Sequence, residues 1–400
     1  MAIIANRIKQ KGFALIFVLV FVAMIMGIVG DIVYQTQVGA RSSIEERNKL
    51  DAQTAALTGV EFAKLLLSLS ILAEKYQNNP LIPLPKNMYS MLNGQPIGAS
   101  GLESLEELSG AKLSKAISKE ILSALKVMPG YFVLNINSEN AKFNLNLLQS
   151  NFSNEAQKAL KRIFSTPDSK KFLANLDLTP QQLVDNLISY IKISNTNAYL
   201  RNVTQVDYNN INAKYKPKNA ALESLEELRR IPGFHLDDIY NVFSPYFTIW
   251  PIIGGSGTLN INSAPIELIA TLLTPENMDP NSLDWDNFEM FRLKNDFNKS
   301  TINDWLTKNL SDYKENTDSL NITKNFIGTK DTIFKVESRG VVNGVEQTLV
   351  IVLQQETVSD QPSPPQPNQN NENQSDQQQN NPKSQTQSSP NFTILYSGWK

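Results

Sequence analysis

Few side chains in this 400-residue sequence belong to the types that do chemistry on a substrate. There is no cysteine and only one histidine, His235, which excludes thiol nucleophiles, cysteine-based zinc sites and Cys–His pairs. No GxSxG, HExxH or Walker A motif occurs. A lone histidine beside a Pro-Gly pair is typical of a surface or structural role. We therefore expect no enzyme activity.

Two pairs of neighbouring carboxylates remain, Asp237 with Asp238 and Asp284 with Asp286. Such pairs can serve as a general acid and base, or as the hard oxygen ligands that Ca²⁺ prefers. The DxDxDG spacing of a calcium loop is absent. Solvated or helix-capping carboxylates are the simpler interpretation. Calcium stays a candidate ligand, and the residues of any metal site stay unknown.

The N-terminal thirty residues predict how the chain is placed relative to a membrane. Arg7, Lys9 and Lys11 precede Gly12, and eighteen uninterrupted apolar residues follow from Phe13 to Gly30. This run approaches the ~20 residues of a membrane helix and exceeds the roughly 7–15 apolar residues of a signal peptide. Because Lys and Arg favour the cytoplasmic side, we expect the N-terminus inside and the chain outside the membrane from Asp31 onward.

A single long helix is predicted over residues 13–76, because no proline interrupts this stretch. Its outer half carries small and apolar residues at spacings of three and four, which make one apolar face. We expect that face to pack against a folded domain. The residues are Ala52, Ala55, Ala56, Gly59, Val60, Ala63, Leu66 and Leu67.

Strand patterns flank a helical middle. Residues 131–137 and 142–146 alternate apolar and polar side chains. Residues 333–338 and 347–353 flank Asn343-Gly344, a strong hairpin signal. Between roughly 150 and 310 the pattern is helical, with proline-containing breaks. Together these patterns predict an α+β fold with helices inserted between strands.

Near the C-terminus, residues 357–390 are dominated by Gln, Asn, Ser and Pro. Such a composition buries too little apolar surface to order itself, so a disordered loop is predicted. The last ten residues differ, because Phe392, Ile394 and Tyr396 alternate and Trp399 follows. We expect residues 391–400 to form a final strand that returns to the sheet; a sticky tail is the alternative.

Two strings occur twice in the same order. LESLEEL stands at 102–108 and 222–228, and LNINS at 134–138 and 259–263. Both are short enough to recur by coincidence, which we favour over a partial duplication.

Residues 225–234 and 259–265 have sequence patterns that resemble a helix-hairpin-helix, a small module that binds nucleic-acid phosphate through backbone amides. The charges oppose that use. Asp237 and Asp238 follow the hairpin glycine, where a nucleic-acid module carries Lys or Arg. The net charge is −2, and losing the three leader cations would make it −5. We therefore expect no nucleic-acid binding.

A set of ordered segments resembles the minor pseudopilin K family of type II secretion. The basic leader ending in Gly12-Phe13 resembles a prepilin signal, and later segments match in order over most of the chain. These are AQTAALTGVEFAKLLL at 52–67, KFNLNLL at 142–148, LVDNLISYI at 183–191, LESLEELRRIPGF at 222–234, LNINSAPIELIATL at 259–272, FKVESRGVVNGVEQTL at 334–349, and the terminal Trp399.

The resemblance implies a pilin-like long helix and antiparallel sheet, with a large inserted all-α domain of helix-hairpin-helix or SAM-like type. The implied regions are a leader (1–12), the pilin helix (13–76), a first part of the pseudopilin core (77–146), the inserted helical domain (147–325), a core hairpin (326–356), the disordered loop (357–390) and the terminal strand (391–400).

It also implies processing. Prepilin peptidase would cut after Gly12 and methylate Phe13 at its new N-terminus. Most members carry Glu at the fifth mature position, where it pairs with the N-terminal amine of a neighbouring subunit; here that position is Phe17. A subunit without this Glu fits the tip of the pseudopilus, as the K type does. Some relatives bind calcium through an acid-rich loop, but residues 193–197 here read ISNTN.

The family further implies partners and a location. The partners are the I-type and J-type minor pseudopilins, the major pseudopilin, the prepilin peptidase and the inner-membrane assembly platform. The protein would be a single-pass inner-membrane protein with a cytoplasmic N-terminus and a periplasmic bulk. Three alternatives stay open: a minor pilin of a type IV pilus, a membrane-anchored helix-hairpin-helix protein that binds DNA, and a membrane-tethered hydrolase.

Overall fold

The computed structural model describes residues 2–75, 88–98, 123, 125–191, 217–252, 259–274, 285–309, 317–356 and 391–400. The chain forms two compact units. Unit 1 comprises residues 1–135, 336–351 and 397–400, and unit 2 comprises residues 136–335 and 352–396.

Unit 1 is built on α1 (Ala2–Lys75), a helix of 74 residues and thus about 110 Å long. The predicted long helix is confirmed as far as Lys75. The predicted apolar face is also confirmed, because all eight of its residues are buried. Small side chains dominate this face, which lets the helix approach the sheet closely. A short helix, α2 (Met88–Met91), packs beside α1.

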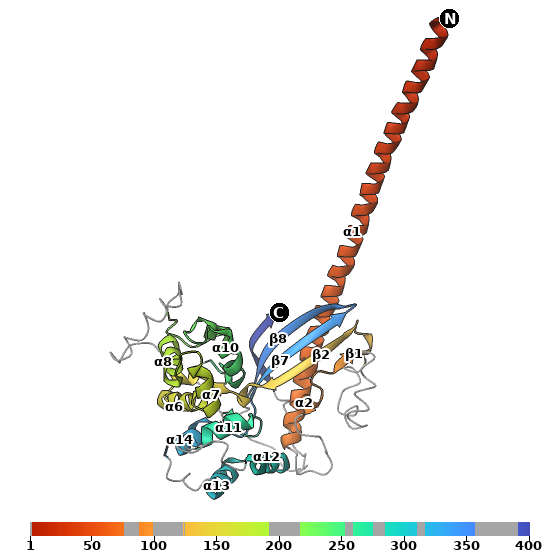
Figure 1. Cartoon of the computed structure of the whole chain (residues 1–400). Helices are drawn as coiled ribbons and strands as arrows, with labels where there is room; N and C mark the ends of the chain where they lie inside the picture. Colours follow the sequence, from red (N-terminus) through yellow and green to blue (C-terminus); the bar gives the residue numbers. More distant parts are fainter. Residues whose placement is uncertain are drawn as a thin grey trace, which may run out of the picture. The chain divides into compact units, whose positions relative to one another are not determined.

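The sheet has five strands in the order β1-β2-β7-β8-β9 (Figure 1). β1 pairs antiparallel with β2, and β7 and β8 form the predicted hairpin. Asn343 and Gly344 at its turn have φ values of 49° and 82°, the pair of positive angles that a type I′ turn requires. The predicted strands at 131–137 and at the C-terminus are confirmed. The strands are β1 (Pro96–Gly98), β2 (Tyr131–Ser138), β7 (Ile333–Val342), β8 (Val345–Gln355) and β9 (Phe392–Trp399).

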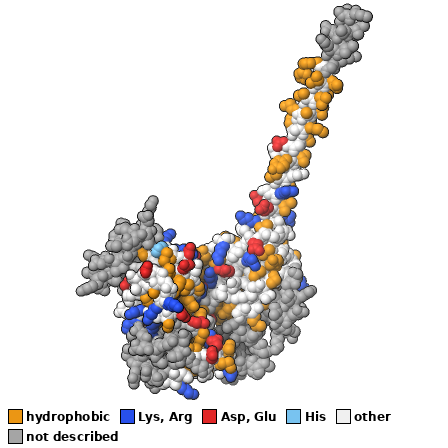
Figure 2. Space-filling model, in the orientation of Figure 1, with side chains coloured by type: hydrophobic (Ala, Val, Ile, Leu, Met, Phe, Trp, Pro, Cys, Tyr) orange, Lys and Arg blue, Asp and Glu red, His pale blue; other side chains and the backbone are white. Residues whose placement is uncertain are grey.

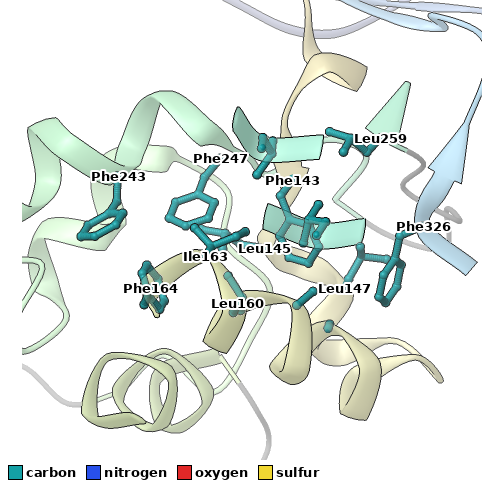
Figure 3. Packing of buried hydrophobic residues seen from close by; sticks show 14 of the residues in the cluster. Phe143, Leu145, Leu147, Leu160, Ile163, Phe164, Phe243, Phe247, Leu259 and Phe326 are labelled. Atoms are coloured by element: carbon teal, nitrogen blue, oxygen red, sulfur yellow. The ribbon is translucent and has the colours of Figure 1, made fainter. Parts of the chain in front are cut away.

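Unit 2 is mainly helical, as the sequence predicts, and its helices enclose one large apolar core (Figures 1 and 3). Phe164 is fully buried in this core, with its ring 4.9 Å from that of Phe243 and 5.9 Å from that of Phe247. The helices are α6 (Ser153–Phe164), α7 (Pro167–Ala174), α8 (Pro180–Ile191), α10 (Asp237–Phe243), α11 (Ile266–Leu273), α12 (Trp285–Lys294), α13 (Lys299–Asn309) and α14 (Thr317–Phe326). The 3-10 turns are η2 (Glu139–Ala141), η3 (Leu145–Gln149), η5 (Leu225–Arg230) and η6 (Ser244–Tyr246).

The predicted strand at 142–146 is wrong over most of its length. Only β3 (Phe143–Asn144) pairs as a strand, and its partner is β4 (Phe247–Thr248), which runs parallel to it. The Asn144 side chain accepts a hydrogen bond of 2.9 Å from the Asn146 N–H, which caps the 3-10 turn that begins at Leu145. A local side-chain bond to the backbone thus ends the strand that apolar alternation alone suggested.

The loop predicted at 357–390 and the LESLEEL copy at 102–108 lie outside the described residues. The predicted domain boundaries stay predictions, since the division between the two units falls inside the long strands.

Candidate assembly and processing site

The N-terminal part of α1 exposes apolar side chains around its whole circumference. Phe13 and Phe17 are each 66% exposed, and their ring centroids lie 5.6 Å apart on successive turns. By length and composition, α1 is the one helix among the described residues that suits a membrane span. Figure 2 shows these side chains covering the shaft of the helix, with charges appearing further along it. A surface of this kind needs lipid or partner helices to cover it.

The three residues predicted for processing and tip function lie on this one segment. The backbone of Gly12 continues into Phe13 as helix, and Phe17 lies one turn beyond Phe13. The first carboxylate after the leader is Asp31, whose Oδ2 accepts a hydrogen bond of 3.1 Å from Gln35 Nε2. No acid therefore stands within the apolar run. Cleavage after Gly12 and methylation of Phe13 stay predictions.

Close backbone contacts join α1 to the sheet of unit 1. A Cβ added at Gly340 on β7 would overlap the Ala52 carbonyl and approach the Ala56 nitrogen to 2.6 Å. A Cβ added at Gly59 on α1 would overlap Ser338 Oγ and lie 2.9 Å from the Phe132 ring. Glycine is thus required on both partners, and the pair of contacts fixes the register of α1 on the sheet.

A polar cluster just after β2, which the sequence did not predict, joins three segments of unit 2. Asn140 Oδ1 accepts hydrogen bonds of 2.8 Å from the backbone N–H groups of Thr332 and Ile333. Asp331 Oδ1 accepts from Ser138 Oγ at 2.5 Å and from Ser263 Oγ at 2.8 Å. The cluster ties the end of β2 to the start of β7 and to the turn after β5 (Leu259–Asn260). Its one sequence signal is the run of polar residues at 137–140 after an apolar alternation.

A buried carboxylate belongs to the same segment. Glu139 is 4% exposed, pairs with Lys142 Nζ at 2.8 Å and accepts a hydrogen bond from Thr248 Oγ1. Because both oxygens have partners, its burial is compensated. Through these contacts Glu139 joins η2 to β4.

Two Asn-x-Asn segments form the same local structure, in which the first Asn side chain accepts a hydrogen bond from the N–H of the second Asn. Asn144 caps the turn containing Asn146, and Asn260 Oδ1 likewise accepts from the Asn262 N–H at 3.0 Å. Asn146 Nδ2 then donates to the carbonyls of Leu222 and Ile249. Asn262 Nδ2 donates to the carbonyls of Phe297 and Thr329. Each Asn-x-Asn turn comes at the end of a two-residue strand that pairs with a parallel strand: β3 pairs with β4, and β5 pairs with β6 (Ile327–Gly328).

The repeated LNINS strings, in contrast, do not share a structure. The first, at 134–138, lies in β2, whereas the second, at 259–263, is a two-residue strand followed by a turn. The structural counterpart of 259–262 is FNLN at 143–146. The LNINS repeat therefore gives no support to a partial duplication, the alternative to the coincidence that we favour.

The hairpin at Pro232-Gly233 turns at a glycine whose amide is hydrogen-bonded within the protein. Gly233 has a φ of 88°, and its N–H donates a hydrogen bond of 3.0 Å to His235 Nδ1. Partial burial lowers the pKa of His235, which keeps the imidazole neutral and able to accept. Asp237 and Asp238 follow as exposed acids.

The cation next to this hairpin is also engaged. Arg229 pairs with Asp237, contacts Glu226 at 3.2 Å and lies 3.9 Å over the Tyr240 ring centroid. The Gly233 amide and the Arg229 guanidinium are therefore both engaged within the protein, and two exposed acids follow where a phosphate would be repelled.

The carboxylate pairs considered for calcium do not come together in the described residues. Asp237 is paired with Arg229, Asp286 is exposed on α12, and Asp284 lies outside the described part of the chain. Within that part, no group of three or more His, Asp or Glu side chains is placed to hold a metal.

The geometry so far defines a class of protein. A long apolar N-terminal helix packs by its outer half on an antiparallel sheet, and a helical domain is inserted between strands β2 and β7: this is a pilin-like α+β protein. Residues 141–252 match the family model described as "Type II secretion system (T2SS), protein K". That match lies within unit 2 and agrees, over this part of the chain, with the family that the sequence resembles.

Among solved structures, the chain is similar to one described as "The Crystal Structure of the GspK-GspI-GspJ complex from enterotoxigenic Escherichia coli Type 2 Secretion System". The two share 13% sequence identity with a TM-score of 0.49, over 90% of this chain and 99% of that chain. No curated protein matches the sequence.

Proposed function

We propose that this protein is a minor pseudopilin of the K type, which initiates or caps the tip of the periplasmic pseudopilus. The observation that carries the proposal is Phe17. It is an exposed apolar side chain one turn from Phe13, at the position where a repeating subunit needs a carboxylate to pair with its neighbour's amine. A subunit that enters the filament first has no such neighbour.

In this proposal the apolar segment of α1 has two roles, membrane anchoring in the precursor and helix packing in the filament. In the precursor it holds the chain in the inner membrane as a single span, with the cationic leader in the cytoplasm and the bulk in the periplasm. Prepilin peptidase then cuts after Gly12, and the freed helix packs against helices of other pseudopilins. The absence of cysteine is compatible with folding in an oxidising compartment.

The proposed partners are the I-type and J-type minor pseudopilins, the major pseudopilin, the peptidase and the assembly platform. The first two are suggested by the complex named in the similar crystal structure. We further propose that the protein works by assembly and not by catalysis, because its buried acid and its histidine are both engaged in structural hydrogen bonds. The hairpin, with its occupied amide, argues against a DNA receptor.

The processing step is tested by mass spectrometry of the N-terminus of the mature protein. We expect methylated Phe13 in the wild type and an uncleaved precursor in a Gly12→Val variant. Any other mature N-terminus would remove the basis of the assignment.

The tip position needs a separate measurement. Immunogold labelling of elongated pseudopili should place the protein at one end of each filament. Regular labelling along the shaft would contradict a tip role while leaving the processing result unaffected. Genomic neighbours of a type IV pilus, rather than of type II secretion, would point to the minor-pilin alternative.

A further inference from the structure

A pocket of about 380 Å³ opens in unit 2 between the start of α7, the end of α10 and the first turns of α11. Its floor is apolar and deeply buried. Ile163 is 6% exposed, and Phe243 and Leu268 are each 2% exposed. Figure 3 shows Ile163 and Phe243 among the buried residues of the apolar core of unit 2. The volume falls within the range of natural ligand sites and exceeds that of a packing defect.

The walls and rim of the pocket have a distinct chemistry. Phe172 and Tyr246 form half-buried aromatic walls, and the Phe172 ring lies 6.4 Å from that of Phe243. Asp168 and Glu267 are exposed at the rim, and no Lys or Arg is among the lining residues. The Thr166 hydroxyl at the rim is already used, because it accepts from the Ser169 N–H and donates to Ser169 Oγ.

The two carboxylates are available to a ligand. No ion pair joins either of them to a residue in the described part of the chain. Each lies in the first turn of its helix. The pocket therefore has an anionic rim and an apolar floor. The rim repels anions, and a purely apolar ligand would leave both carboxylates without a partner.

We propose that this pocket binds a basic side chain, Arg or Lys, together with an adjacent aliphatic side chain from an exposed segment of a partner protein. The cationic head pairs with Asp168 and Glu267, and its methylene stem lies along Phe172 and Tyr246, where a cation–π contact adds to the attraction. The aliphatic neighbour fills the space above Phe243 and Leu268. This site does not depend on the tip position and gives unit 2 a docking function of its own.

The test uses the full chain in lipid nanodiscs and a fluorescein-labelled peptide, Ala-Leu-Arg-Leu-Ala, capped at its C-terminus. A matched peptide carries citrulline in place of arginine, which keeps the shape and removes the charge. Fluorescence anisotropy should show binding of the arginine peptide at least ~10-fold tighter than that of the citrulline peptide, since tenfold is about one lost charge pair. This comparison uses the unmodified protein and so does not depend on the folding of a variant.

The protein side is tested with the double variant Asp168→Asn, Glu267→Gln. It should bind the arginine peptide at least ~10-fold more weakly, whereas the control Asp304→Asn, an exposed acid on α13 outside the pocket, should bind as the wild type does. Equal binding of both peptides, undiminished binding by the double variant, or no binding to the wild type would each overturn the proposal.

Discussion

The backbone N–H of Gly233 donates a hydrogen bond to Nδ1 of His235, two residues further along the hairpin. The amide that a nucleic-acid module offers to phosphate is thereby satisfied within the protein. The bond needs an unprotonated Nδ1, so it links the hairpin to pH.

The first prediction concerns this pH dependence. Because burial lowers the pKa of His235 in the folded protein, the unfolded state binds a proton more readily, and stability should fall as pH drops below the ordinary value of about 6.5. Thermal unfolding of wild type and His235→Ala between pH 7.5 and 5 measures the effect. The difference in Tm between the two proteins should shrink as the pH falls, and a constant difference would contradict this role for His235.

A second prediction concerns the contact between α1 and the sheet. Gly340→Ala places a methyl group against the Ala52 carbonyl, so we expect a loss of about 1–3 kcal/mol in the free energy of unfolding. Gly39→Ala is the matched control, because a Cβ there meets nothing within 4 Å and the helix gains about 1 kcal/mol from alanine. Denaturant titration distinguishes the two. Equal effects of both changes would mean that helix and sheet do not meet as described.

A third prediction addresses the polar cluster after β2. Asn140 is 7% exposed and accepts two backbone hydrogen bonds, so Asn140→Ala leaves two buried N–H groups without an acceptor. We expect destabilisation of about 2–4 kcal/mol. The exposed Asn154 on α6 serves as control, and Asn154→Ala should change stability by less than about 0.5 kcal/mol. Amide exchange at Thr332 and Ile333 should rise in the Asn140 variant alone.

The fourth prediction concerns Phe17. A Phe17→Glu precursor places a carboxylate near the start of the apolar run, where the cost stays below the roughly 2.5–3.5 kcal/mol that insertion scales give for a charge at the helix centre. Less precursor should enter the membrane fraction, whereas Phe17→Leu should behave as wild type. If the Glu variant inserts normally and is then found along the filament shaft, a carboxylate at residue 17 is what directs a subunit to the shaft. If it inserts normally and is found only at the tip, Phe17 does not determine where the subunit stands in the filament.

Several features of this protein were predictable because they depend on local sequence. The long helix follows from the absence of proline and the three- and four-residue spacing of Ala52 to Leu67, and the β7–β8 hairpin follows from Asn343-Gly344. The family resemblance came from ordered segments, and the family model matches residues 141–252, where three of these segments lie. The predicted strand at 142–146 failed because apolar alternation does not record the side-chain cap of Asn144.

The sequence by itself determined the membrane-compatible helix, the α+β class and the shortage of catalytic groups, since composition and periodicity set these directly. Only the tertiary structure decided which polar residues meet. Asn140 binds backbone nearly two hundred residues away, and Asp168 and Glu267 reach one rim from different helices. Such encounters depend on how helices and strands pack over long chain separations, where hydrogen-bond geometry and exclusion of overlap select partners that no local pattern specifies.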